Sequence, residues 1–166
     1  MRLNAEIRYD ADPAAVSAML LDTAFQERKC EATGATEHQV QIDEFDDGSA
    51  VITTRRTMPT DRVPDFVRGF VGATLEVVQN DDWGAPSADG SREGSMVVEI
   101  KGAPVRLTGT LRLAPAPGGG SVETIEGDLK ASVPLIGGKI EKAVEPALQA
   151  AIKVEQQQGR AWLAAH

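Results

Sequence analysis

The C-terminal stretch SVPLIGGKIEKAVEPALQAAIKVEQQQGRAWLA, residues 132–164, decides the fold. From Ile136 onward its apolar residues recur at helical spacing and its polar residues take the opposite side, which predicts a long amphipathic helix. About 30 helical residues span roughly 45 Å, enough to cross a tilted sheet whose strands are about ten residues long. We therefore expect this helix to cover a curved sheet as a lid.

Pro146 lies in the middle of the expected helix, where it removes a backbone hydrogen bond and clashes with the preceding turn. It either kinks the helix around a curved surface or begins a second helix, and the unbroken periodicity favours the kink. Gly137 and Gly138 are poor helix formers. They fit a chain reversal where backbone lies close to the sheet, and they predict a flexible start to the lid.

The N-terminal residues RLNAEIRY, 2–9, alternate polar and apolar side chains, which is the period of a half-buried strand. Asp12 followed by Pro13 is a typical helix N-cap and first-turn pair, so one or two short helices are expected from there to Gly34. From residue 35 to about residue 134, strand patterns then recur at hairpin spacing. The dipeptide Asp47–Gly48 marks a tight turn in the first hairpin.

One segment interrupts the series of strands. Val63, Phe66, Val67 and Phe70 recur at helical spacing, which predicts a short helix between the third and fourth strands. The expected order is a strand, a helix pair, six strands with one helical insert, and the long final helix. Antiparallel hairpins cannot hide both faces of such a sheet, so the helices must cover one face of an α+β fold.

The chain resembles the START-like superfamily, also called the Bet v 1-like or helix-grip fold, in the group with polyketide cyclases and lipid-transfer proteins. The stretches that carry the resemblance are TRRTMPTDRVPDFVRGFVG (54–72), Trp83 and VPLIGGKIEKAVEPAL (133–148), and they point to a family of unknown function within it. The resemblance implies one START-like domain over residues 1–166, with a seven-stranded antiparallel sheet around the C-terminal helix. It also implies a cavity for hydrophobic ligands, with catalysis in some members and not in others.

Charge and composition exclude several classes of protein. The net charge is −8 and the basic residues are scattered apart from Arg55–Arg56, so neither a nucleic-acid stripe nor a basic membrane-binding helix face is present. No run of about 18 apolar residues and no signal-peptide core occurs. The single Cys30 fits a reducing compartment. We expect a cytoplasmic protein without stable membrane insertion.

The sequence contains no convincing metal, cofactor or nucleophile motif. Its two histidines, His38 and His166, and the lone Cys30 cannot assemble a zinc site. DEFDDGSAVITT (43–54) fails the calcium-loop spacing at its third and twelfth positions. LIGGKIEK (135–142) lacks the upstream glycine and the following Ser or Thr of a phosphate loop. No cofactor is therefore expected.

Four acidic residues on strands could supply a general acid or base: Glu76, Glu99, Glu123 and Asp128. Alternation argues against Glu76 and Glu99, because each is out of phase with its apolar neighbours.

Arg56 shares a strand face with Ile52 and Met58. If that face points inward, Arg56 is a polar group beside an apolar cavity and could bind a ligand carboxylate or phosphate. The alternatives are an ion pair with one of the many acidic residues, or exposure at a sheet edge.

The expected cavity lining combines strand residues, the short helix and the lid. Trp83, which shares a face with Gln79, either caps the cavity or packs in the core. The complete predicted lining is Arg56, Phe66, Phe70, Leu75, Val77, Gln79, Trp83, Met96, Val98, Ile100, Leu107, Leu111, Ile125, Leu129, Ile140, Val144 and Leu148.

The mostly aliphatic lining suits acyl chains or isoprenoids better than flat rings. The leading hypothesis is that the protein binds or carries a hydrophobic small molecule (lipid, acyl chain, isoprenoid or polyketide) without catalysis. One alternative is a cyclase- or dehydratase-type enzyme, in which Arg56 and Gln79 converge in the pocket. The other is a protein-interaction module with a collapsed cavity, and a homodimer or protein partner stays open.

Overall fold

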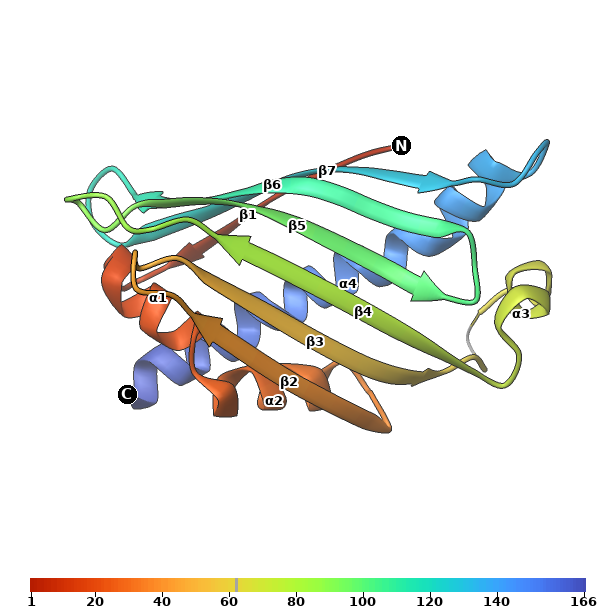
Figure 1. The fold of residues 1–166 in the computed structure, drawn as a ribbon, viewed down its shortest axis with the longest axis horizontal. Coiled ribbons are helices and arrows are strands. Elements are labelled where there is room, and N and C mark those ends of the chain that lie inside the picture. The colour runs from red at the N-terminus through yellow and green to blue at the C-terminus, as the bar shows by residue number, and fades with distance from the viewer. Residues whose placement is uncertain (62) are drawn as a thin grey trace.

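A seven-stranded antiparallel sheet, covered on one face by helices, dominates the computed structural model, which describes residues 1–61 and 63–166 (Figure 1). Arg62, inside the stretch 54–72, lies outside the described residues. The strands follow the order β1-β7-β6-β5-β4-β3-β2 across the sheet. The elements are β1 (Arg2–Tyr9), α1 (Pro13–Leu20), α2 (Thr23–Ala32), β2 (Glu37–Glu44), β3 (Ala50–Pro59), α3 (Asp65–Val71), β4 (Thr74–Trp83), β5 (Arg92–Lys101), β6 (Val105–Pro115), β7 (Ser121–Ala131) and α4 (Gly137–Ala165). The predicted α+β helix-grip architecture is confirmed.

The first elements form for the local reasons that their sequence indicates. β1 buries Leu3, Ile7 and Tyr9 and exposes the intervening polar residues. The Asp12 carboxylate accepts a hydrogen bond from the Ala15 amide at 2.8 Å and so caps α1, as predicted. The segment that follows forms two helices, α1 and α2, which lie on the same face of the sheet as α4 (Figure 1).

α4 continues without interruption through Pro146, so the alternative in which Pro146 begins a second helix is wrong. Figure 1 shows this helix crossing the face of the sheet from the end of β7 toward α1 and α2. The two glycines at its start differ. A Cβ on Gly137 would collide with the Ala131 carbonyl oxygen, so the predicted close approach is real at Gly137, whereas a Cβ on Gly138 would meet open space.

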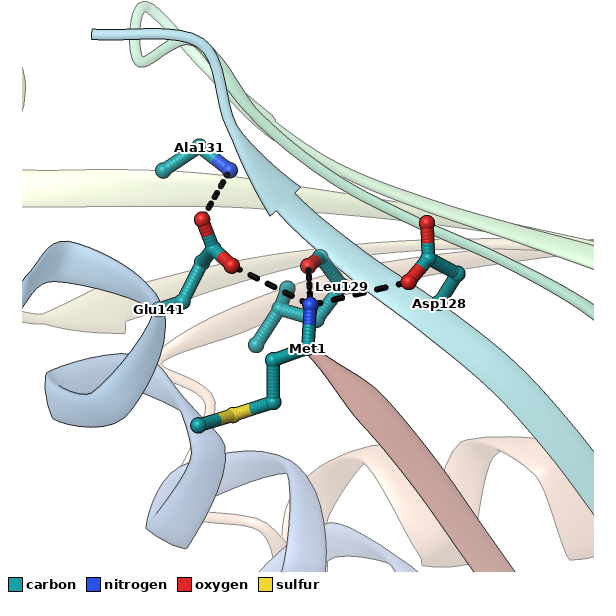
Figure 2. Close-up of polar contacts among 5 residues, drawn as sticks. All are labelled: Met1, Asp128, Leu129, Ala131 and Glu141. Atoms are coloured by element: carbon teal, nitrogen blue, oxygen red, sulfur yellow. Dashed lines mark hydrogen bonds and ion pairs between the residues drawn. The ribbon is translucent and has the colours of Figure 1, made fainter. Parts of the chain in front are cut away.

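The start of α4 is tied to the edge of the sheet by polar contacts (Figure 2). The Met1 amino group donates to the Leu129 carbonyl at 2.8 Å and to Oε1 of Glu141 at 3.1 Å, and it lies 3.5 Å from Oδ1 of Asp128. The second oxygen of Glu141 accepts from the Ala131 amide at 3.4 Å. The hydrogen bond with Met1 lowers the pKa of Glu141 and raises the pKa of the amino group. This contact connects β1, β7 and α4.

The other end of α4 is fixed by apolar packing. Trp162 meets Phe25 of α2 in an edge-to-face arrangement, with ring centroids 5.7 Å apart. Gly159 is buried against Tyr9 of β1, and a Cβ at this position would lie 2.6 Å from Cε1 of the Tyr9 ring. The helix can therefore approach β1 this closely only because residue 159 has no side chain.

The Gly159→Ala substitution is expected to lower the free energy of unfolding by about 1–3 kcal/mol, because the methyl group must displace the Tyr9 ring or the helix. Gly138→Ala is the matched control in the same helix, and it is expected to raise that free energy by up to about 1 kcal/mol through helix propensity. Urea unfolding of both variants measures the two effects. Equal stabilisation by both substitutions would contradict the tight contact at Tyr9.

Candidate functional site

A small cavity lies between the inner face of the sheet and α4. Its volume of about 50 Å³ exceeds the roughly 15 Å³ that one water molecule needs. It is far below the roughly 300–1,000 Å³ of pockets that hold drug-sized ligands. Its wall is lined by the apolar residues Met96, Val98, Leu107, Leu111, Ile125, Leu148, Ala151 and Ile152 and the polar residues Lys29, Thr33, Arg56, Gln79, Asp81, Glu123 and Glu155.

Five charged or ionisable residues of this wall form what we call the buried polar cluster: Lys29, Arg56, Asp81, Glu123 and Glu155. They come from α2, β3, β4, β7 and α4, so the cluster exists only once both helices lie on the sheet. Most ionisable residues of globular proteins are exposed, and groups of this kind inside a domain need partners.

Within the cluster, an ion pair joins α2 to α4. Nζ of Lys29 lies 3.2 Å from Oε2 of Glu155, and the two side chains are only 10% and 12% exposed. Burial by itself lowers the pKa of Lys29, but the charges of Glu155 and Asp81 outweigh it and the pKa is raised. Lys29 is therefore a cation at neutral pH, and it holds α2 against α4.

Asp81 points inward from β4 and is 9% exposed. Burial is the main reason that its pKa is raised, to about 6, while the Lys29 charge acts in the opposite direction. Nε2 of Gln79 lies 3.1 Å from both carboxylate oxygens and donates to them. Asp81 is therefore mostly ionised at pH 7.5 but becomes protonated in mild acid.

Glu123 is the most deeply buried carboxyl group of the cluster, at 3% exposed. Burial and the neighbouring Glu155 carboxylate raise the pKa of Glu123 well above its ordinary value. Within the part of the chain that the structure describes, its Oε2 has no hydrogen-bond partner. A protonated Glu123 provides both a donor and an acceptor at the cavity wall.

Arg56 lies on the inner face of β3, beside Thr54 and Ile52, and is 9% exposed. Burial lowers the pKa of its guanidinium, and the charges of Asp81 and Glu155 act against this effect. Among residues 1–61 and 63–166, Nε of Arg56 has no hydrogen-bond partner. The exposed-edge alternative for Arg56 is therefore wrong, and its side chain lies beside the cavity.

The structure brings part of the predicted lining to the cavity: Arg56, Gln79, Met96, Val98, Leu107, Leu111, Ile125 and Leu148. A second group instead packs in or against the hydrophobic core: Phe66, Val77, Trp83, Ile100, Leu129, Ile140 and Val144. Leu75 is half-buried on β4 outside the cavity wall, and Phe70 on α3 is exposed.

Seven residues of the cavity wall were absent from the predicted lining: Lys29, Thr33, Asp81, Glu123, Ala151, Ile152 and Glu155. Two of them could have been recognised from their position in the alternating pattern of a strand. Asp81 has the same strand phase as Gln79 and Trp83, and Glu123 has the same phase as Ile125. The other three strand acids that the sequence offered as a general acid or base, Glu76, Glu99 and Asp128, lie on the outer face of the sheet.

A larger hollow of about 610 Å³ opens on the outer face of the sheet around the β5–β6 turn. Its charged side chains include Glu99, which pairs with Lys101 at 3.2 Å and with Arg106 at 3.4 Å, and all three are substantially exposed. Exposed pairs of this kind are solvated, and the small-molecule sites of proteins are instead enclosed and largely apolar. The buried polar cluster, and not this hollow, is the candidate site.

The sheet, the long C-terminal helix and the cavity between them define the helix-grip fold of the START and Bet v 1-like superfamily. The crystal structure of TTHA0849 from Thermus thermophilus has a TM-score of 0.63 at 14% identity, covering 99% of this chain and 98% of that one. A START superfamily protein from Mycobacterium smegmatis has a TM-score of 0.55 at 10% identity, covering 97% and 98%. The di-domain ARO/CYC StfQ from the steffimycin biosynthetic pathway has a TM-score of 0.64 at 9% identity, covering 99% of this chain and 50% of that one.

The chain belongs to the family described as protein of unknown function (DUF2505), whose model matches residues 4–163. The uncharacterized protein Rv0481c of Mycobacterium tuberculosis (strain ATCC 25618 / H37Rv) is 31% identical over 122 residues, which are 73% of this chain and 70% of that protein. The prediction of a family of unknown function is confirmed, and the solved structures share the predicted fold.

Membrane spans and metal centres have their own structural requirements. No helix among the described residues combines the length and apolarity that crossing a bilayer requires. In the same described part of the chain, no three His, Cys, Asp or Glu side chains gather as ligands of a metal ion would.

Proposed function

We propose that the protein binds a hydrophobic small molecule between the sheet and α4 and carries it without chemical change. The observation that carries this proposal is the cavity itself, whose wall combines eight apolar residues with seven polar ones, two of which have atoms without a partner among the described residues. Binding sites for small molecules also combine apolar surface with placed polar groups. The confirmed fold, which is shared with a START superfamily protein, supports the same function.

The ligand class that fits is aliphatic: a lipid, an acyl chain, an isoprenoid or a linear polyketide. The cavity of about 50 Å³ holds only a polar head group, so a chain must displace side chains of the lid. Leu148 and Ile152 of α4 are half-buried and line the cavity, which makes them the side chains that a ligand tail would move. Cys30 is buried, and a free thiol fits the reducing cytoplasm, the compartment that we propose.

The Ala151→Leu substitution is expected to weaken binding of N-phenyl-1-naphthylamine, an uncharged fluorescent probe, by at least about tenfold, because the larger side chain fills the cavity. Ala150→Leu on the exposed side of α4 is the matched control and should leave the affinity unchanged. Fluorescence titration measures both affinities, and urea unfolding confirms that both variants fold. Equal affinities in both variants would place the probe outside the cavity.

Native mass spectrometry of protein purified from its own host tests the proposal directly. A stoichiometric aliphatic molecule, released on denaturation, would support the carrier function and name the ligand class. Absence of any bound molecule, together with no binding of the probe, would contradict it and favour a protein-interaction module.

A second candidate, a dehydratase- or cyclase-type enzyme, is favoured by one observation: two buried carboxyl groups with raised pKa, Asp81 and Glu123, line the same cavity. Such groups are suited to general acid–base catalysis near neutral pH. Prolonged incubation of the extracted ligand with the protein separates the two functions. A ligand recovered with unchanged mass and chromatographic retention supports the carrier, and loss of water or ring closure supports the enzyme.

A further inference from the structure

One apolar side chain projects from the surface in a backbone conformation that leucine disfavours. Leu135 lies in the turn between β7 and α4, is fully exposed, and has a φ of 72°, the one positive φ outside glycine in the described part of the chain. The Gly137 amide donates to the Val133 carbonyl at 2.9 Å and closes the turn around it. Glycine would form this turn without strain. The fold gains no packing from this leucine, and strain that is kept without structural benefit points to a function.

Two further exposed hydrophobic side chains lie at the same end of the sheet. Phe70 belongs to α3, and Ile136 follows Leu135 directly before α4. Nζ of Lys139 in α4 lies 4.5 Å from the centroid of the Phe66 ring in α3, so α3 and the start of α4 share one end of the molecule (Figure 1). We call Phe70, Leu135 and Ile136 the apolar tip.

The chain around the apolar tip is basic, although the net charge of the protein is −8. Residues 129–144 contain three lysines, Lys130, Lys139 and Lys142, and one acidic residue, Glu141. Glu141 pairs with the Met1 amino group at 3.1 Å. The three lysines are exposed and belong to none of the ion pairs among the described residues. The apolar tip therefore lies among free positive charges.

The other exposed large hydrophobic side chain of the described residues, Phe45, has the opposite surroundings. Residues 40–50 around it contain four acidic residues and no lysine or arginine. Phe45 lies in the turn before β3, and α3 follows β3, so the ten residues of this strand separate the two ends by about 33 Å. That separation exceeds the Debye length of about 8 Å at physiological salt. The acidic end therefore does not cancel the attraction of an anionic surface to the tip.

We propose that the apolar tip docks reversibly on the surface of an anionic lipid bilayer. Leu135 enters the acyl region, and the three lysines lie among the anionic head groups. The docking element is a turn with flanking lysines, and not the basic helix face that the sequence lacks. A protein partner fits less well, because a standard interface buries about 1,600 Å² and three side chains supply a small part of that area. This inference goes beyond the proposed function, since it places the protein at a surface where aliphatic molecules are held.

Co-sedimentation of the full chain with lipid vesicles tests the docking. The protein is expected to bind vesicles of equal parts phosphatidylcholine and phosphatidylglycerol at least about tenfold more tightly than vesicles of phosphatidylcholine alone, because each lysine near an anionic surface adds to the attraction. Added salt should weaken this binding by screening the charges. Equal binding to both vesicle types would overturn the inference. So would no binding to either, which would favour a protein partner for the tip.

Two variants with the same change of charge assign the docking to the tip. Leu135→Asp is expected to weaken binding to the anionic vesicles by at least about tenfold, because one leucine side chain no longer enters the bilayer. Phe45→Asp is the matched control, since it also replaces an exposed apolar side chain with a carboxylate, and it should keep the affinity within about threefold. Equal losses in both variants would mean that total charge, and not the tip, controls binding, and would contradict the inference.

Leu135→Gly separates docking from a structural role. Glycine accepts the positive φ, so urea unfolding should show a stability equal to or above that of the parent protein, while vesicle binding falls by about tenfold. A clear loss of stability would show that the leucine supports the fold and would overturn the argument from strain. The fluorescence titration that tests the proposed function contains no vesicles, so either proposal can fail without the other.

Discussion

Replacing Lys29 with methionine is expected to lower the free energy of unfolding by about 3–5 kcal/mol at pH 7. The substitution leaves Glu155 buried beside Glu123 and Asp81 without the cation that lies 3.2 Å away in the parent protein. Breaking a buried pair costs this much because the remaining charge keeps its desolvation penalty and loses its partner. Urea unfolding followed by circular dichroism measures the change.

Two further variants make this result specific to the buried pair. Arg55→Met breaks an exposed pair with Glu76, in which the two side chains are 48% and 44% exposed, and exposed pairs contribute at most about 1 kcal/mol. The double variant Lys29→Met with Glu155→Leu removes both charges and should recover most of the stability. A loss for Lys29→Met no larger than that for Arg55→Met would mean that water reaches the Lys29–Glu155 pair.

The elements of the fold could be predicted from the sequence because each has a strong local pattern. β1 alternates Leu3, Ile7 and Tyr9 inward, and Asp12 caps the helix that follows. The uninterrupted periodicity around Pro146 correctly indicated one helix, α4. Patterns with a period of two or of 3.6 residues depend on near neighbours in the chain, so tertiary contacts were not needed to recognise them.

The candidate site could be predicted only in part, because it combines residues that no single pattern connects. Arg56 was identified on its strand face, although its inward direction stayed open. Asp81 and Glu123 had the correct phase for the cavity, but acidic residues are so often exposed that phase alone did not single them out. Lys29 and Glu155 come from helices and lie 126 residues apart in sequence, and only the packing of α2 on α4 pairs them.

Parent protein is expected to lose stability relative to the Asp81→Asn variant as the pH rises from 4 to 7. The pKa of Asp81 is raised from 3.8 to about 6 in the folded state. A raised pKa means that the folded protein favours the protonated form, so this contribution is present at low pH and disappears as the pH passes through about 6. A shift of this size corresponds to about 3 kcal/mol.

The comparison with Asp81→Asn isolates this effect from other titrations. Asp47 and Glu141 have a lowered pKa, so their contributions are lost as the pH falls, but they are common to both proteins and cancel in the difference. Lys29, whose pKa is raised, loses its contribution only in strongly alkaline solution. Asp82→Asn, on the exposed face of the same strand, is the matched control.

Urea unfolding of the three proteins between pH 4 and pH 7 measures this difference, and its direction tests the electrostatics of the site. A parent protein that becomes less stable than Asp81→Asn as the pH rises would mean that desolvation of Asp81 outweighs its attraction to Lys29 and Arg56. The opposite trend would mean that these cations stabilise the carboxylate more than burial destabilises it. In that case the positive charges of Lys29 and Arg56 would dominate the electrostatics of the cluster, and the cavity would favour a ligand with an anionic group.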